Sequence, residues 1–138
     1  MRAKEYLSKA FLIAKKIEAR QKQLEFWKNN PPYATPVISD MPKGTSSVKS
    51  MIEEHSLRVM DLENLIASMM EELSVARKEA ESLIASINDP QSEVLLEMRY
   101  LSFMSWESIS SVLGISVRSV FRLHSQALDM CDAVLSRG

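Results

Sequence analysis

The chain has 138 residues, of which 46% are apolar and 25% charged, and its net charge is −1. This length suits one or two small domains with a buried core, and only three glycines favour an all-α fold over a sheet. The single Cys131 excludes an internal disulfide, and no apolar run approaches the roughly 20 residues of a membrane span. We therefore expect a soluble intracellular protein.

A basic helix is predicted over residues 3–28. Residues 1–30 carry eight Lys or Arg against three Glu, a net charge of +5. The helix prediction rests on side chains that recur at alternating spacings of four and three: Tyr6, Ala10, Ile13, Ile17, Arg20, Leu24 and Trp27. A linker at about residues 29–45 follows, in which four prolines forbid a continuous helix.

An acidic helix is predicted over residues 46–88, where residues 45–88 carry four basic and eight acidic groups. An unbroken heptad repeat predicts a coiled coil here, and further apolar residues beside it indicate three or more packed helices. Residues 1–88 are therefore expected to form a helical hairpin that also joins subunits; whether the first helix packs within or between chains stays open. The residues expected to join subunits, called the seam below, are Val48, Ile52, Val59, Leu62, Ile66, Met69, Leu73, Leu83 and Ile87.

A second domain is predicted over residues 89–138. Asp89 and Pro90 are typical of a helix cap and a first helical position, so a supporting helix should start there. This helix should end near residue 101, before a short break at about residues 102–105. We expect the domain to have a self-contained core made of Val94, Leu95, Met98, Leu101, Trp106, Leu113, Val120, Leu123 and Leu128.

The segment from Trp106 to Ser125 has the pattern of a helix-turn-helix. Gly114 stands where the chain must turn sharply, and glycine accepts a positive φ at little cost. Ser110 is small enough for a close helix crossing, and Ser105 and Ser116 can cap the two helices. The shared apolar core would be Ile109, Leu113, Ile115, Val120 and Leu123. An ordinary helical hairpin is the alternative reading.

The second helix, about residues 117–137, is predicted to be a DNA-recognition helix lying in the major groove. Its outer face carries arginines and short hydrogen-bonding groups, which are the types that contact base edges and phosphates. A solvated face without a partner is more often rich in Glu and Lys. The residues predicted to contact double-stranded DNA are Ser116, Arg118, Ser119, Arg122 and Gln126.

The sequence RYLSFMSWESISSVLGISVRSVFRLHSQAL resembles region 4 of bacterial sigma-70 factors and the related phage late-transcription activators of the RinA and ArpU kind. Leu113–Ser116 match the turn of that pattern and Ala127–Leu128 match its end, while Ser108 is inserted in the preceding triplet. The resemblance covers roughly the last third of the chain. It implies a phage or prophage transcription regulator that binds DNA as an oligomer in the cytoplasm of a bacterial host, with RNA polymerase as a further candidate partner.

Two other functions stay open. One is the DNA-recognition small subunit of a phage packaging terminase, which also joins a helix-turn-helix to a coiled oligomerisation region. The other is a sigma-like module that binds polymerase and does not itself bind DNA. Residues 91–138 carry four arginines against five acidic residues, and this low charge keeps the second alternative open.

Catalysis finds no support in the sequence. His55 and His124 lie in separate segments, and neither has Cys or carboxylate neighbours at the spacing of metal ligands. His124 is expected either to touch a phosphate or to be a neutral surface residue, and Cys131 is expected to be a buried thiol. We therefore expect no enzyme activity, no metal or other cofactor and no small-molecule substrate.

Overall fold

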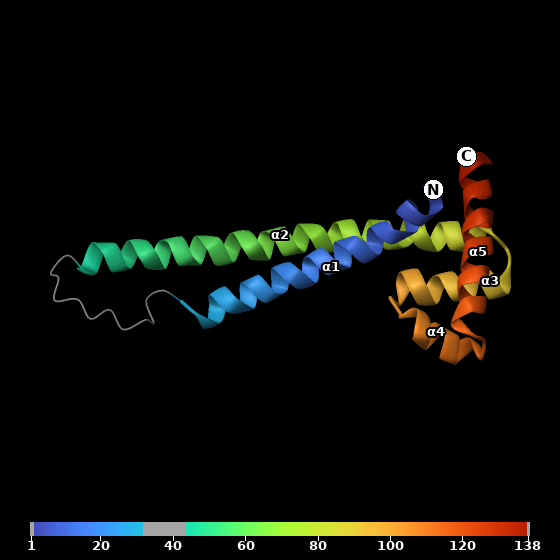
Figure 1. The fold of residues 1–138 in the computed structure, drawn as a ribbon. Coiled ribbons are helices and arrows are strands. Elements are labelled where there is room, and N and C mark those ends of the chain that lie inside the picture. Colours follow the sequence, from blue (N-terminus) through green and yellow to red (C-terminus); the bar gives the residue numbers. More distant parts are fainter. Residues whose placement is uncertain (1, 32–43, 138) are drawn as a thin grey trace. The chain divides into compact units, whose positions relative to one another are not determined.

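The computed structural model describes residues 2–31 and 44–137, and of residues 44–47 only the backbone. Over these residues the fold is all-α, as predicted, and contains no strand (Figure 1). The elements are α1 (Arg2–Asn29), α2 (Gly44–Ser86), α3 (Pro90–Leu96), the π-helical segment η2 (Glu97–Leu101), α4 (Trp106–Leu113) and α5 (Val117–Arg137). Most of the proline-rich linker predicted at about residues 29–45 lies outside the described residues.

α3 begins with the helix cap and the first-position proline that the sequence predicts. Asn88 has a positive φ of 51°, so the chain leaves α2 before Asp89. The Asp89 carboxylate accepts a hydrogen bond from the backbone N–H of Ser92 at 3.3 Å, and Pro90 occupies the first helical position. Both features stabilise a helix start, because a cap satisfies a free N–H group and proline has none to lose.

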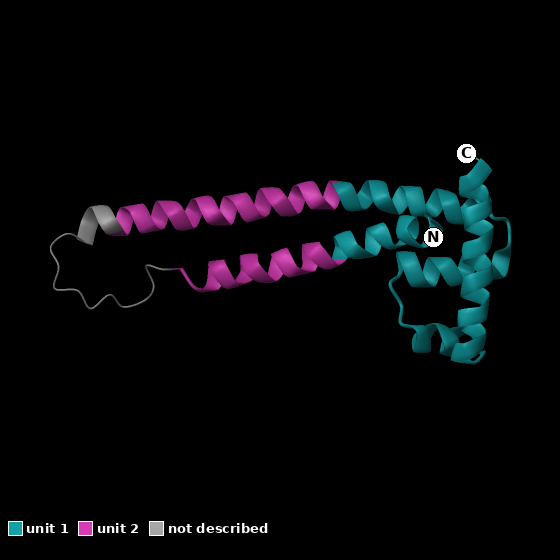
Figure 2. Ribbon diagram, turned by 45° about the horizontal axis from the view of Figure 1, so that its top comes forward, with its two compact units in different colours: residues 1–14, 72–138 teal, residues 15–71 magenta. Residues whose placement is uncertain are grey.

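The described chain divides into two compact units, residues 1–14 with 72–138 and residues 15–71 (Figure 2). In the second unit, the end of α1 contacts the first half of α2. Lys28 forms an ion pair with Glu63 at 3.4 Å, and the Arg58 guanidinium lies 4.6 Å from the centre of the Trp27 ring. Both contacts are exposed, so each contributes little stability by itself.

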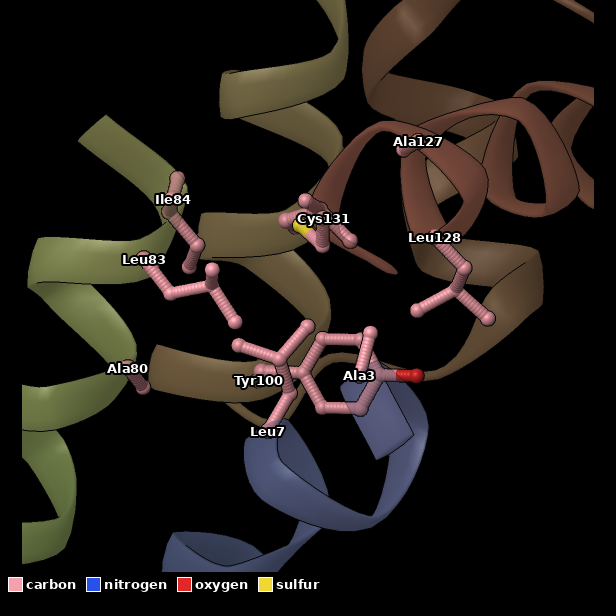
Figure 3. Close-up of a cluster of buried hydrophobic side chains, with 10 residues drawn as sticks. Ala3, Leu7, Ala80, Leu83, Ile84, Tyr100, Ala127, Leu128 and Cys131 are labelled. Carbon is pink, nitrogen blue, oxygen red and sulfur yellow. The ribbon is translucent and has the colours of Figure 1, made fainter. Parts of the chain in front are cut away.

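The first unit contains a cluster of buried side chains from four helices and η2, which we call the base cluster (Figure 3). Its fully or nearly fully buried members are Ala3, Leu7, Ala80, Leu83, Ile84, Leu96, Tyr100, Ala127, Leu128 and Cys131. The Ala3 N–H donates a hydrogen bond to the Asp132 carboxylate at 2.9 Å, so α5 caps the first turn of α1. Arg77 of α2 donates to the Leu101 carbonyl at 2.8 Å.

The base cluster contradicts the expectation of a self-contained core for residues 89–138. Leu128 belongs to the base cluster and Leu101 packs on it, alongside side chains from α1 and α2. Val94, another residue of the predicted core, is exposed. The reason is the length of α5. Its 21 residues span about 30 Å at 1.5 Å per residue, so its second half extends past the small core around Gly114 and needs other cover.

Many residues of the seam are already covered within one chain. Ile66, Met69 and Leu83 are buried, whereas Val48 and Ile52 remain 39% exposed. The other four are half-buried: Val59, Leu62, Leu73 and Ile87. In the base cluster, α1 packs on α2 of the same chain. The role of the seam between subunits stays a prediction.

Candidate nucleic-acid interface

Gly114 forms the turn between α4 and α5 as predicted. It adopts the left-handed conformation at φ 69°, and its N–H donates to the Ser110 carbonyl at 2.9 Å. The Ser110 hydroxyl donates to the carbonyl of Ile115 across the turn. Apart from Gly114 and its two chain neighbours, no described residue lies within 4 Å of the position that a Cβ would take on Gly114. Glycine is therefore favoured here by backbone conformation and not by lack of space.

Both helices begin with the predicted serine caps. Ser105 accepts a hydrogen bond from the N–H of Ser108 at 3.2 Å, and Ser116 accepts one from the N–H of Ser119 at 3.1 Å. The Ser116 hydroxyl also donates to that of Ser119 at 3.0 Å. These bonds satisfy N–H groups that an uncapped helix leaves free.

The apolar side chains of α3, α4 and α5 meet in a second cluster, which we call the turn cluster. Leu95, Ile109 and Val120 are fully buried at its centre. Partly buried side chains surround them: Met98, Met104, Trp106, Leu113, Ile115 and Leu123. The predicted shared core of the two helices is therefore confirmed, and it fixes which side of α5 faces outward.

The outward side of α5 carries the predicted contact residues. Arg118 and Arg122 are exposed and, with the half-buried Ser119, line a hollow of about 260 Å³. Ser116 and Gln126 are also exposed but do not line this hollow. Three of the five predicted residues thus lie next to one another on the surface of α5.

Phe121 lies beside Arg118 on α5 and was missed in the sequence analysis. Its side chain is 48% exposed, and its ring meets the Trp106 ring edge-to-face at 5.2 Å. The available signal was its spacing of three residues from Arg118, which makes the two side chains neighbours on the helix surface.

Trp106 connects this face to a second, basic hollow of about 330 Å³. The Arg99 guanidinium lies 4.1 Å from the Trp106 ring centre and donates to the Met104 carbonyl at 2.9 Å. The hollow combines two cationic side chains with apolar and aromatic ones. Its lining is Lys4, Ser8, Phe11, Leu12, Arg99, Tyr100 and Trp106.

His124 is not at the surface, so neither expected role for it is correct. Its side chain is buried, and its Nε2 lies 2.7 Å from the Tyr100 hydroxyl. Burial lowers the pKa of His124 to about 4, with the positive charges of Lys4 and Arg99 adding to the effect. Burial also raises the pKa of Tyr100 to about 12. A neutral imidazole and a protonated phenol therefore share a hydrogen bond inside the domain.

Cys131 is fully buried in the base cluster, as predicted, and burial raises its pKa to about 11. A thiol of this kind is a poor nucleophile, because the thiolate is the reactive form. Within residues 2–31 and 44–137, no group of three or more His, Cys, Asp or Glu side chains is placed to hold a metal ion. None of the described helices is long and apolar enough to span a membrane.

Comparison with known proteins gives one informative result. No curated protein and no solved structure shows a significant match to the chain. A family model described as "Protein of unknown function (DUF1492)" matches residues 47–132, which are more than half of the chain and include α3, α4 and most of α2 and α5. The chain is a member of the DUF1492 family.

Proposed function

We propose that this protein is a sequence-specific DNA-binding transcription regulator of a phage or prophage, acting as an oligomer. One observation carries the proposal: α5, which follows α4 and the Gly114 turn, exposes Arg118 and Arg122 next to each other on its surface. The turn cluster holds the opposite side of α5, as a recognition helix in the major groove requires.

The charge of the C-terminal segment supports an oligomer. Residues 91–138 have a net charge of −1, so a single copy neutralises few phosphates and binds weakly. Two tethered copies raise the effective local concentration and gain about 10²–10⁴ in affinity when the tether spans both sites. Val48 and Ile52, the exposed end of the seam, offer apolar surface for such an association.

The resemblance of residues 99–128 to sigma-70 region 4 and to activators of the RinA and ArpU kind favours transcription over other DNA functions. No feature of the described residues specifically favours the packaging-terminase alternative.

A polymerase-binding module is the second candidate, and the basic hollow favours it. Lys4 and Arg99 place two positive charges beside Leu12, which is 59% exposed. A surface of this composition suits an acidic segment with apolar residues on RNA polymerase. This module would use α1 and η2 rather than the outward face of α5.

The test is a selection of binding sites from a randomised DNA duplex pool, followed by affinity measurement at fixed salt. We expect enrichment of a defined sequence. Because a base contact is worth about 1–3 kcal/mol, Arg118→Ala with Arg122→Ala should weaken binding at least about tenfold. Arg137→Ala, at the far end of α5, is the matched control and should bind normally.

Absence of an enriched sequence, or equal affinity of the double variant, would overturn the proposal. In that case binding of purified bacterial RNA polymerase, lost on Arg99→Ala, would support the second candidate.

A further inference from the structure

We infer that Phe121 contacts the C5 methyl group of a thymine in the major groove and thereby determines part of the recognised DNA sequence. This inference rests on the proposed function and adds a residue and a base to it. It follows from the position of Phe121, from the way its ring is held and from the chemistry of base edges.

Phe121 lies at the edge of the buried side of α5. Its neighbour Val120 is fully buried in the turn cluster, whereas Phe121 is 48% exposed. Residues three and four apart are neighbours on a helix surface, so Phe121 and Arg122 flank Arg118 on its two sides. A large exposed apolar ring thus stands beside one of the two arginines that we propose to contact DNA.

The Phe121 ring is held in place before any ligand binds. It meets Trp106 at 5.2 Å with an interplanar angle of 72°. Trp106 is itself packed between the Arg99 guanidinium, 4.1 Å from its centre, and the His124 ring at 4.7 Å. Such a support restricts the rotamers of Phe121, and a group ordered in advance loses less entropy on binding.

The chemistry of the major groove then selects the partner. A phenyl ring cannot exchange hydrogen bonds with the N7, O6, N6, O4 or N4 groups of the bases. The thymine methyl is the apolar group that a base pair presents in this groove, and phenylalanine is among the side chains that contact it. The guanidinium groups of Arg118 and Arg122 can bind guanine or phosphate nearby. The site should therefore contain a thymine close to the bases contacted by the arginines.

Replacing thymine by uracil tests this directly, because it removes only the methyl group. The probe is the duplex enriched by the wild-type protein, resynthesised with uracil at one thymine position at a time. We expect one or two positions at which the wild-type protein loses about 3–10-fold in affinity, the scale of one buried methyl contact. Phe121→Ala should bind the thymine duplex more weakly and bind both duplexes equally.

Val112→Ala is the matched control. Val112 is an exposed apolar residue of α4, 64% exposed, and its variant should keep the wild-type preference for thymine. Phe121→Leu keeps an apolar group and should keep part of the preference, which separates a methyl contact from a general loss of folding. The uracil series with the wild-type protein needs no variant and shows whether a thymine methyl is contacted, and the Phe121 variants show whether Phe121 makes that contact.

The outcomes are distinct. If the wild-type protein enriches a duplex but binds every uracil version as tightly, the inference is wrong and the proposed function stands. The same holds if Phe121→Ala keeps the full preference for thymine. If no duplex is enriched, the proposed function fails and the inference fails with it.

Discussion

The buried His124 makes the stability of the first compact unit depend on pH. In the unfolded chain its imidazole has the ordinary pKa of 6.5, whereas burial lowers the pKa in the folded protein to about 4. Between these values the unfolded chain carries the extra proton, so acid favours unfolding. The stabilisation from a neutral His124 is therefore complete above about pH 6.5 and is lost as the pH falls towards 4.

The size of the effect follows from the two pKa values. One pKa unit corresponds to about 1.4 kcal/mol, so lowering the pH from 7 to 4.5 should remove about 2 kcal/mol from the free energy of unfolding. Because the His124 side chain is only 9% exposed, water screens it little, and most of its pKa shift counts in this free energy. The hydrogen bond between Tyr100 and His124 adds to the stability, so Tyr100→Phe should cost about 1 kcal/mol at neutral pH.

Urea unfolding followed by circular dichroism, at one protein concentration and several pH values, measures this contribution. His124→Gln is the control, because it removes the titrating group while other acidic groups still titrate. The wild-type free energy of unfolding should fall more steeply than that of His124→Gln over this range. Parallel curves, or an NMR titration that gives His124 a pKa near 6.5, would refute the reasoning.

Three further predictions concern the turn, the α1 cap and self-association. Gly114→Ala should destabilise the protein by about 1 kcal/mol through backbone strain alone, measured as a lower Tm, and no change would contradict a required positive φ. Asp132→Ala removes the acceptor of the Ala3 N–H and should cost about 1 kcal/mol in urea unfolding; an unchanged midpoint would show that this cap is dispensable. Val48→Asp with Ile52→Asp should lower the mass found by light scattering while helicity is kept. An unchanged mass would show that this end of the seam does not join subunits.

The sequence was sufficient for the local structure around the turn. Ser105, Gly114 and Ser116 obey rules that act within a few residues, so their caps and the positive φ were predictable. Helical periodicity likewise predicted that Val120 and Leu95 are buried. The candidate DNA-contacting face of α5 follows from these, because burial of one side defines the other.

The contacts that could not be predicted from the sequence join residues far apart in the chain. Helical spacing alone could not show that Tyr100 would reach His124 across 24 residues, so His124 was placed on the surface. Similarly, nothing in residues 89–138 indicates that Leu128 would pack with Ala3 and Leu7. Phe121 was missed for another reason. An apolar pattern counts every aromatic residue as a core residue, so it does not single out one that is exposed.

His124 lies between the two clusters. The side chains of α5 that enter the two clusters must therefore keep a fixed rotation relative to one another about the helix axis. The His124 ring contacts Tyr100, a member of the base cluster, and Trp106, a member of the turn cluster. The segment of α5 from Val120 to Leu128 must therefore present both sets of buried side chains at fixed rotations about one axis. One inserted residue would turn the following side chains by about 100° and withdraw them from the base cluster. Natural variants of this protein should accordingly differ in side chains within this segment and never in its length.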